Sequence, residues 1–544
     1  MAYIKYARTA SGGVSVQVVR YKAGRIEVLK HFGTAHNDLS LDHLIDQAED
    51  FLGANAQLTL DIGVEPPARS RPRMADISNY HDTANSGQGT LDFAASRPAE
   101  SQEPAARNGA RAGRSPRVVA SPARLVWDVL DGVYRKLGFD EIGDETFAAT
   151  VIARVVEPSS KMQVRRIIGE LGRVPMHYNT VYNALRRCIE RDYYQHISRK
   201  CHAYVRQHHQ VTMVLYDVTT LYFETPKEDE LRKIGMSKER RVDPQIVVGL
   251  VTDNNGFPLH IDFFHGRTAE TTTLIPMITA YQHAHDLQGL TVVADAAMLS
   301  AGNLDALDAA GIDYIVADRL KKALHMVTIS DDDLEEWSKR TDTYEVVEST
   351  KAMGPKDAPT TRRLVVGFSP KRYKYDVYSL GKQKEKAEDA VNGTKQTRLP
   401  RFVSKAGAKL TVNEKAYDKA LSLAGWKGYV TSLSQEQLSG REVISFYHEL
   451  YHIENDFRMA KTDLQARPIF HRTQDAIRAH LTVVMAALAM SKHIYLTSGV
   501  TAPKLVERLK ELRHATVDTG THRYDIPPNI DEETTNLITT ILED

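Results

Sequence analysis

PQIVVGLVTDNNGFPLHIDFFHG, residues 244–266, reads as two β-strands joined by a tight turn at Asn255-Gly256. Both runs are rich in β-branched and aromatic residues, and an Asn-Gly pair between such runs is the strongest short-range signal of a β-hairpin. The stretch therefore predicts an antiparallel pair, and the segments around it decide what kind of sheet that pair belongs to.

The neighbouring segments alternate between strand and helix. VTMVLYD (211–217), before the hairpin, is an apolar, β-branched run. After the hairpin come a helical pattern at 269–286, a strand at 290–299, a helix at 300–311 and a strand at 313–319. Helical connections between parallel strands are right-handed. We therefore predict an α/β fold with a ribonuclease H-like catalytic core, in which the first and fourth strands are parallel neighbours.

Composition places the chain among soluble globular proteins. Of its 544 residues 42% are hydrophobic and 26% charged, which suggests several domains with buried cores. Lys plus Arg equals Asp plus Glu at 70 each, so the net charge of zero argues against indiscriminate nucleic-acid binding but permits local basic faces. The N-terminus lacks a secretory signal, only two cysteines occur, and the apolar run at 479–494 is interrupted by polar residues. We expect a cytoplasmic protein without a membrane span.

Shifts in pattern divide the chain into seven segments. These are a small α+β domain (1–64), an Arg-, Ala-, Ser- and Pro-rich linker (65–122), a helical region (123–209), the first part of the core (210–319), a β-rich insertion (320–440), the second part of the core (441–500) and a C-terminal helical tail (501–544). The first domain reads as two strands around Ala23-Gly24 and a short amphipathic helix. We interpret the linker as flexible, because it has almost no periodic apolar pattern.

The helical region is the predicted DNA-binding domain. Thr180 is the expected N-cap of a helix through VYNALRRCIERDYY, and the short connection before it suits a helix-turn-helix. The arginines of the region are Arg165, Arg166, Arg173, Arg186, Arg187 and Arg191. They would form a DNA-facing surface that includes Arg186 and Arg187; the alternative is a helical bundle with a solvated basic face.

Two aspartates mark the carboxyl ends of the first and fourth predicted strands. Asp217 ends the first strand and Asp295 the fourth, and open α/β sheets bind ligands at that edge. Two carboxylates held together favour a cation between them, and oxygen ligands suit Mg²⁺ or Mn²⁺. A pair of such ions would activate a water or a 3′-hydroxyl and stabilise the leaving oxygen of a phosphodiester. The alternatives are a turn that bonds Asp217 to Thr219 and Thr220, and a helix N-cap at Asp295.

A third carboxylate lies in YHELYHIENDFRMAK, residues 447–461, which reads as one unbroken helix. Glu454, Arg458 and Lys461 fall at i, i+4 and i+7 and so share a face, with Tyr447 seven residues before the glutamate. We predict that Glu454 completes the metal site and that Tyr447 and the two cations contact DNA phosphates. The buried stripe is expected at Phe446, Leu450, Ile453, Phe457 and Leu464. The alternative is a surface Glu–Arg pair worth about 0.2–0.5 kcal/mol.

Arg267 and Glu270 follow the third predicted strand in GRTAETT (266–272) and face the same end of the sheet. Arg267 would bind DNA there and Glu270 would assist, although a helix-capping loop explains both residues equally well.

These residues carry a resemblance to a known family. The sequence resembles the DDE transposases of bacterial insertion sequences, in particular the insertion-sequence-four superfamily, whose last motif is Tyr, two residues, Arg, three residues, Glu, six residues, Lys. Tyr447, Glu454 and Lys461 match that spacing, whereas Leu450 occupies the position of the arginine. Arg458, one turn beyond Glu454, would take over part of that arginine's phosphate contact. The resemblance covers most of the chain, and the linker is its least familiar part.

The resemblance implies cut-and-paste DNA transposition, in which water attack nicks the element ends and the freed 3′-hydroxyl joins target DNA. It implies two Mg²⁺ or Mn²⁺ ions held by Asp217, Asp295 and Glu454, and double-stranded DNA as the partner, both as transposon ends and as target. We expect a homodimer, because pairing two ends needs at least two subunits. Family members also stack a flipped base on an aromatic residue of the insertion; Trp337 and Trp426 are the candidates, with core packing as the alternative.

Three rival functions use part of the same pattern. A ribonuclease H-like nuclease or resolvase would share the site without strand transfer, but would not need the helical region or so large an insertion. A domesticated DNA-binding protein would have lost catalysis, which the three intact acids argue against. A metal phosphohydrolase acting on small molecules gives no reason for the basic helical region.

Overall fold

The structure, a computed structural model, divides the chain into two compact units, Met1–Ala110 and Arg111–Asp544, each with its own hydrophobic core. It describes residues 2–8, 13–22, 25–35 and a few positions between 41 and 51, and then residues 116–543 apart from 226, 237–241, 319, 321–335, 337–344, 356, 394–398, 407–408 and 520–521. The predicted linker therefore lies outside the described residues as far as position 115.

The first unit contains a three-stranded antiparallel sheet, whose strands are β1 (Ala2–Arg8), β2 (Val14–Lys22) and β3 (Arg25–Ala35). The predicted hairpin is confirmed, since Lys22 pairs with Arg25 on either side of the expected turn. Strand β1 was not predicted from the sequence. The apolar side chains of β2 pack with Leu41, Ile45 and Ala48, whose spacing is that of one helix face.

The second unit begins with a helical layer, in agreement with the prediction. Its helices are α2 (Arg124–Lys136), α3 (Glu145–Val156), α4 (Val164–Glu170), α5 (Tyr178–Glu190) and α6 (Tyr193–His208), with 3₁₀ turns η2 (Phe139–Ile142) and η3 (Lys161–Gln163). The predicted N-cap at Thr180 is wrong: α5 begins two residues earlier, and the ring of His177 accepts the backbone N–H of Asn179. Asp192, at φ +49°, ends the predicted long helix and caps α6.

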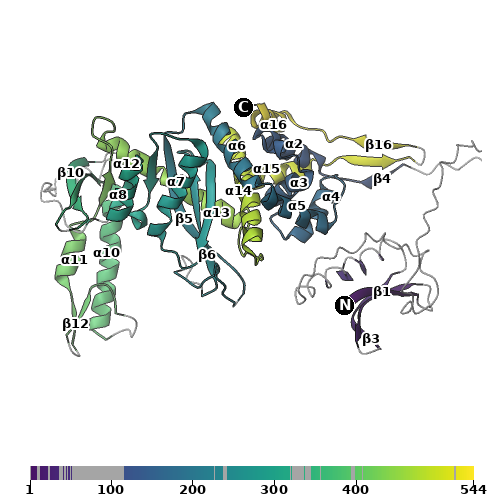
Figure 1. Cartoon of the computed structure of the whole chain (residues 1–544), viewed down its shortest axis with the longest axis horizontal. Coiled ribbons are helices and arrows are strands. Elements are labelled where there is room, and N and C mark those ends of the chain that lie inside the picture. The colour runs from purple at the N-terminus through teal and green to yellow at the C-terminus, as the bar shows by residue number, and fades with distance from the viewer. Residues whose placement is uncertain are drawn as a thin grey trace, which may run out of the picture. The chain divides into compact units, whose positions relative to one another are not determined.

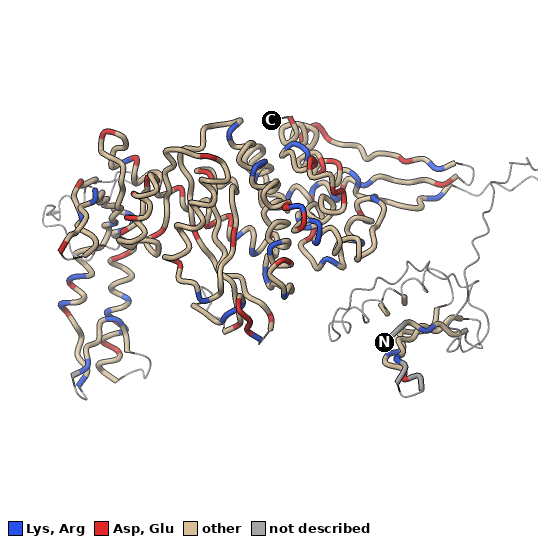
Figure 2. Tube along the Cα trace, in the orientation of Figure 1, with Lys and Arg blue, Asp and Glu red and all other residues tan. Residues whose placement is uncertain are grey.

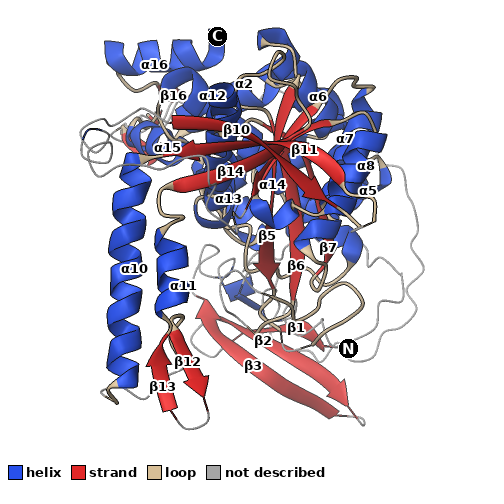
Figure 3. Ribbon diagram, turned by 90° about the vertical axis from the view of Figure 1, so that its left-hand side faces the viewer, coloured by secondary structure: helices blue, strands red, loops and turns tan. Residues whose placement is uncertain are grey.

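Eight strands form one mixed sheet in the order β10-β11-β14-β9-β8-β5-β6-β7 (Figure 3). They are β5 (Met213–Tyr222), β6 (Gln245–Thr252), β7 (Pro258–His265), β8 (Thr291–Ala294), β9 (Asp313–Asp318), β10 (Glu345–Met353), β11 (Thr360–Phe368) and β14 (Trp426–Thr431). The hairpin β6–β7 is present, and its Gly256 has φ +81°, a conformation that a side chain disfavours. Strands β5, β8 and β9 are parallel neighbours joined through α7 (Leu274–His285) and α8 (Ala301–Ala309). The predicted adjacency of the first and fourth strands is therefore confirmed.

The range predicted as a β-rich insertion, 320–440, contributes strands to the main sheet and also leaves it. Strands β10, β11 and β14 extend the main sheet, because β14 pairs antiparallel with β9. Between β11 and β14 the chain leaves the sheet and forms a projecting arm (Figure 1). The arm consists of α10 (Pro370–Val391), β12 (Val403–Ala406), β13 (Lys409–Val412) and α11 (Glu414–Leu421). Sequence patterns show where strands form, but not which sheet accepts them.

The remaining helices cover the sheet and tie it to the helical layer. Helices α12 (Gly440–His448) and α13 (Leu450–Thr462) pack on the sheet, α12 against β8, β9, β10, β11 and β14, and α13 against β5 and β6. Helix α14 (Gln474–Ser498) lies between the sheet and the helical layer and contacts β7, α3 and α5 (Figure 1). Among the described residues it is the helix long and apolar enough to cross a membrane, yet its central residues are buried within the protein. The prediction of a buried core helix is confirmed.

The C-terminal segment is not wholly helical as predicted. It contains α15 (Ala502–Glu511), α16 (Glu532–Glu543) and two strands, β15 (Ala515–Asp518) and β16 (Arg523–Ile526). These strands form a small sheet with β4 (Arg117–Ala120), which the sequence analysis had placed in the linker. Pairing over such a separation leaves no local signal in the sequence.

Candidate active site

Strand register places Asp217 and Asp295 side by side. The parallel ladder of β5 and β8 pairs Leu215 with Val293 and Tyr216 with Ala294, and the two aspartates are the next residues of each strand. The backbone of Asp295 stays extended, with φ −73° and ψ 163°. Neighbouring strands are about 4.8 Å apart, so the two carboxylates start from adjacent backbone positions.

Asp217 does not end its strand, contrary to the prediction. Strand β5 continues to Tyr222 and pairs with β6 along this length, Asp217 opposite Leu250. A turn around Asp217 is therefore excluded. The site is instead set by the end of β8. This neighbouring strand stops at Ala294, opposite Tyr216, so Asp217 has no β8 partner on that side.

The pleat of β5 fixes the direction of the Asp217 side chain. The preceding residue, Tyr216, is buried and donates its hydroxyl to Thr273 Oγ1 at 2.8 Å, where α7 begins. Successive strand residues point to opposite faces of a sheet. Asp217 therefore points to the other face, on which α13 packs against β5.

Asp295 holds the N-cap position of the 3₁₀ turn η5 (Ala296–Met298), as the alternative assignment expected, but its carboxylate makes no capping bond. Instead, Asp295 Oδ1 accepts the hydroxyl of Tyr447 at 3.0 Å. Tyr447 is 6% exposed and lies on α12, so this bond joins the end of β8 to a helix 152 positions away. The carboxylate of Asp295 is exposed and available for further ligands.

The helix that carries Glu454 is broken, not continuous as predicted. Helix α12 ends at His448 and α13 begins at Leu450, with Glu449 between them. Tyr447 and Glu454 therefore belong to different helices, and the tyrosine is buried whereas the glutamate is exposed. The predicted apolar stripe is correct for Leu450, Ile453 and the later positions, which are buried, while Phe446 is half-buried.

Lys427, which was not predicted as a site residue, also lies next to Tyr447. Lys427 Nζ of β14 lies 4.1 Å from the ring centroid of Tyr447 and 5.7 Å from that of Tyr429. The negative charges of Asp295 and Glu454 act to raise the pKa of both Lys427 and Tyr447. Burial, followed by the charge of Asp295, raises the pKa of Tyr447 above its usual range, so its hydroxyl remains a donor.

Burial and the nearby Arg372 lower the pKa of Lys427 to about 8, against the opposing effect of Asp295 and Glu454. This lysine is therefore still largely protonated at neutral pH. A single sequence offered no sign of it, because a lysine on a strand next to Trp426 matches no motif spacing.

A cavity of about 600 Å³ is lined by residues that follow Asp295 in the chain. Its lining includes Ala296 and Ser300, together with Asp318 at the end of β9 and Lys351 of β10. Lys351 Nζ pairs with Asp318 Oδ1 at 2.5 Å. The hollow therefore lies at the carboxyl ends of the parallel strands, where open α/β sheets bind ligands.

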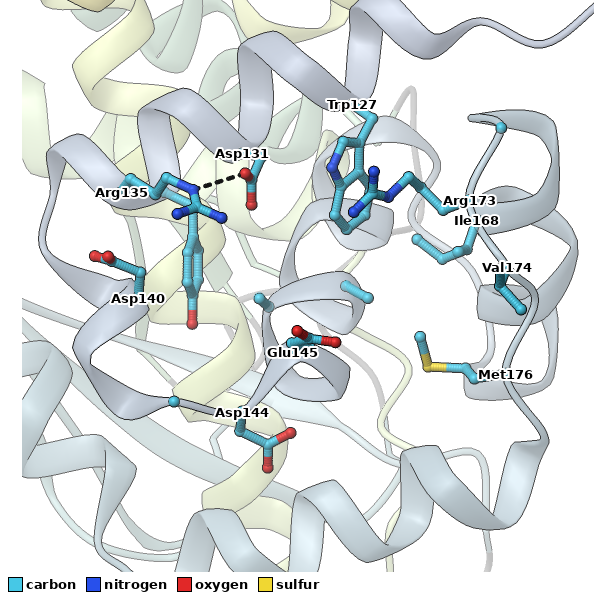
Figure 4. A pocket seen from close by; sticks show the side chains of 15 residues that line it. Trp127, Asp131, Arg135, Asp140, Asp144, Glu145, Ile168, Arg173, Val174 and Met176 are labelled. Carbon is cyan, nitrogen blue, oxygen red and sulfur yellow. Dashed lines mark hydrogen bonds and ion pairs between the residues drawn. The ribbon is translucent and has the colours of Figure 1, made fainter.

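A second cavity, of about 700 Å³, lies in the helical layer and, like the first, is lined by none of the three acids. Trp127, Asp131, Asp144, Glu145 and Arg173 are among the residues that line it (Figure 4). The guanidinium of Arg173 stacks on Trp127, 5.0 Å from the ring centroid. Its acidic lining does not suit a DNA phosphate.

The predicted basic residues differ in their surroundings. Arg458 is exposed and donates to Asn455 Oδ1 at 2.8 Å, and among the ion pairs of the described residues none joins it to Glu454. Lys461 is half-buried on the same helix. Arg267 lies away from the aspartates, since it donates to Ile234 O at 3.0 Å and pairs with Glu228 at 3.4 Å.

The two arginines predicted on the helical layer are engaged within the protein. Arg187 pairs with Asp144 at 2.7 Å, and that carboxylate is the N-cap of α3. Arg186 is 66% exposed and pairs with Glu190 one turn later at 3.5 Å. The structure thus makes Arg187 an anchor between two helices, and only Arg186 remains open to a ligand.

Of the two tryptophans predicted to stack on a flipped base, the structure describes only Trp426. Trp426 packs on Phe368, with ring centroids 5.0 Å apart, and is half-buried, which fits the core-packing alternative. Trp337 lies outside the described residues.

The acids fit a hard divalent cation in kind, because Asp217, Asp295 and Glu454 offer only oxygen ligands. As they stand, no three His, Cys, Asp or Glu side chains of the described part of the chain are close enough together to hold a metal ion. Like-charged carboxylates repel one another until a cation lies between them. The observed arrangement places Asp217 beside Asp295, and Glu454 near enough for its charge to act on the same Tyr447 and Lys427 as Asp295.

Comparison with known proteins assigns the family. The transposase DDE domain matches residues 209–490, more than half of the chain. The chain belongs to the DDE transposase family. The matched region of this transposase starts just before β5, ends within α14 and includes all three predicted acids. No curated protein matches this transposase. Among solved structures, a low similarity is found to the cryo-EM structure of the piggyBac transposase synaptic complex with hairpin DNA. The identity is 8% and the TM-score 0.33, over 73% of this chain and 81% of that one.

Proposed function

We propose that this transposase catalyses cut-and-paste DNA transposition of an insertion sequence of the insertion-sequence-four type, binding the terminal inverted repeats of the element. It would hydrolyse a phosphodiester at each element end and then join the freed 3′-hydroxyl to target DNA. The observation that carries the proposal is the register of β5 and β8, which puts Asp217 and Asp295 at adjacent positions, with Tyr447 bonded to Asp295.

The first role of the protein would be to hold the carboxylates in position. Asp217, Asp295 and Glu454 would hold two Mg²⁺ or Mn²⁺ ions, which supply an activated oxygen nucleophile and stabilise the leaving oxygen. The hydroxyl of Tyr447, which donates to Asp295 Oδ1, orients that carboxylate and leaves its other oxygen free of this bond. A ribonuclease H-like core explains this arrangement, because the sheet order β7-β6-β5-β8-β9 is the one that the hairpin and crossovers predict.

The second role would be to bind the DNA around the reacting phosphate. Arg458 and Lys461 follow Glu454 on α13, one and two turns further along, where they would hold neighbouring phosphates. Arg186 and Arg267 are exposed cations more distant from the acids and would contact the DNA elsewhere. A synaptic complex of two DNA ends would require at least two copies of the chain.

The proposal is tested by DNA cleavage with the full chain. A duplex containing the junction between the element and its flanking DNA is incubated with Mg²⁺ or Mn²⁺, and 3′-ends at the junction are mapped. Asp295→Asn should lower the cleavage rate at least about 10³-fold, because metal-ion stabilisation is worth several kcal/mol and each 1.36 kcal/mol changes a rate tenfold.

The matched control is Asp128→Asn, which changes an exposed carboxylate on α2 and should leave cleavage unchanged. Equal cleavage by wild type and Asp295→Asn would contradict the site. Pre-cleaved ends offered with a target plasmid separate a transposase from a nuclease, since a nuclease without strand transfer would give no joined product.

A further inference from the structure

The arginine that the motif places at position 450 has no counterpart there in this transposase. Leu450 is 6% exposed and belongs to the apolar stripe of α13 that packs on the sheet. An arginine at this position would be buried in the core. Position 450 therefore supplies no cation to the reacting phosphate, and a cation from another element can act there beside Arg458 and Lys461 of α13.

Strand β14 carries such a cation, Lys427, close to Asp295. Lys427 Nζ lies over the ring of Tyr447, 4.1 Å from its centroid, and the hydroxyl of the same tyrosine bonds Asp295 at 3.0 Å. The rings of Tyr429 and Tyr447 lie 4.9 Å apart and form the floor under the lysine. The ammonium group thus lies over the ring of the same tyrosine whose hydroxyl bonds the carboxylate.

The pleat of β14 directs this lysine toward α12. Lys427 and Tyr429 share a face, and Tyr429 contacts Tyr447 of that helix. Gly428 faces the other side, where an added Cβ would lie 2.8 Å from the Leu320 side chain. The strand therefore has little freedom to rotate the lysine away from the acids.

Among the described residues, no carboxylate is bonded to Lys427. Within the described residues, none of the ion pairs includes it, although it is only partly exposed and the charges of Asp295 and Glu454 reach it. A partly buried ammonium that lacks an ion-pair partner is costly unless an anion arrives. A phosphate bound between the acids would be that anion, because a cation on an aromatic floor keeps its outer side free for a ligand.

We propose that Lys427 binds the reacting DNA phosphate, its ammonium group contacting a non-bridging oxygen and so supplying from β14 the cation that position 450 lacks. This inference rests on the proposed function. Among the described lysines and arginines, Lys427 is the one whose charge lies over the ring of Tyr447, the side chain that bonds Asp295.

Lys427→Gln is the test, because it removes the charge and keeps a polar side chain. Two quantities are measured on the full chain: the DNA cleavage rate with Mg²⁺, and the dependence of DNA affinity on salt in EDTA. Cleavage should fall about 10²-fold, the usual effect of losing one preorganised donor at a reacting centre. The slope of log affinity against log salt should shrink by about 0.9, which is the loss of one phosphate contact.

Lys427→Arg keeps the charge and should restore most of both quantities. The matched control is Lys504→Gln, which removes the same charge from an exposed position on α15 and should change neither. If Lys427→Gln does not fold, Lys427→Met, which keeps the packing of the stem over the tyrosines, gives the same comparison.

The outcomes separate the inference from the proposed function. If wild type cleaves DNA, Asp295→Asn does not, and Lys427→Gln matches wild type in both rate and salt slope, the proposal for Lys427 is overturned while the transposase assignment stands. A rate that falls with an unchanged salt slope would show that Lys427 only supports Tyr447, and would also overturn it. If wild type does not cleave DNA at all, the proposed function fails and this inference falls with it.

Discussion

Tyr447 shows how one residue differs from its sequence-level interpretation. The motif spacing placed it on the exposed face of a continuous helix as a DNA contact, yet the break at Glu449 turns it inward. It is buried, its ring packs on Tyr429, and its hydroxyl is bonded to Asp295. In the structure its hydroxyl bonds a carboxylate, and we propose that it positions Asp295, whereas the predicted DNA contact stays a prediction.

Tyr447→Phe removes only the hydroxyl. We expect DNA cleavage to fall about tenfold, since a hydrogen bond to a charged group is worth about 1.5–3 kcal/mol and part of that orientation is lost. DNA affinity in EDTA should stay within about twofold of wild type if the buried hydroxyl acts on Asp295 and not on the DNA backbone. Electrophoretic cleavage assays and fluorescence anisotropy measure the two quantities; weaker binding at an unchanged rate would return Tyr447 to the DNA interface.

At the scale of elements, the arm built from α10, β12, β13 and α11 has a net positive charge, although the whole chain is neutral. Residues 370–421 contain 13 Lys and Arg but 6 Asp and Glu, a net charge of +7 in a chain whose net charge is zero. Lys and Arg gather along the arm (Figure 2). The arm has a small core of its own around Leu380, Ala387 and Phe402, so its surface is free to carry charge.

Neutralising the tip of the arm should weaken DNA binding without changing the chemistry. The triple variant Lys405→Gln, Lys409→Gln and Lys415→Gln removes three exposed charges. The salt slope of DNA affinity should shrink by up to about 2.7, at about 0.9 for each phosphate released. Cleavage at saturating protein should be unchanged.

Lys382→Gln is the control within the arm, because the ammonium of Lys382 is already paired with Glu385 at 2.9 Å. Its effect on the slope should be smaller than that of any single change at the tip. A triple variant that binds DNA like wild type at every salt concentration would remove the arm from the interface.

At the scale of the whole molecule, α14 is the element on which both layers of the second unit depend. It contacts the helical layer through α3 and α5 and the sheet through β7. Its Lys492 pairs with Asp456 of α13 at 2.8 Å, with side chains 4% and 0% exposed. Gly256 of the β6–β7 hairpin approaches so closely that an added Cβ would lie 2.6 Å from Lys492 Nζ. Three elements thus meet at one buried ion pair.

Asp456→Ala should destabilise the second unit by about 3–5 kcal/mol, because it leaves the charge of Lys492 buried without a partner. The double variant Asp456→Ala, Lys492→Met should recover part of that loss, since neither charge remains. Denaturant titration followed by tryptophan fluorescence gives the free energies of unfolding. The single variant Lys492→Met completes the comparison. A loss of unfolding free energy in the double variant larger than the summed losses of the two single variants would contradict a pairwise interaction here.

Much of the core and of the candidate site could be predicted from local patterns alone. The β-branched runs, the Asn255-Gly256 turn and the lengths of the helical connections were enough to order β5 to β9 and to bring Asp217 next to Asp295. Backbone pleat and the handedness of crossovers act within a few dozen residues, so the sequence expresses them directly. Glu454 was chosen from its spacing to Arg458 and Lys461 on a helix, which is also a local property, and its place in a metal site stays a prediction.

Only the tertiary structure decided what these residues touch. The extension of the sheet by β10, β11 and β14, the inward turn of Tyr447 and the place of Lys427 above it all depend on pairing and packing between distant elements. A strand pattern is the same whichever sheet accepts it, and a helix pattern does not record a one-residue break. The sequence by itself was therefore enough to propose the acids and to order strands β5 to β9. Long-range packing decided that Tyr447 bonds Asp295 and that Lys427 lies over Tyr447.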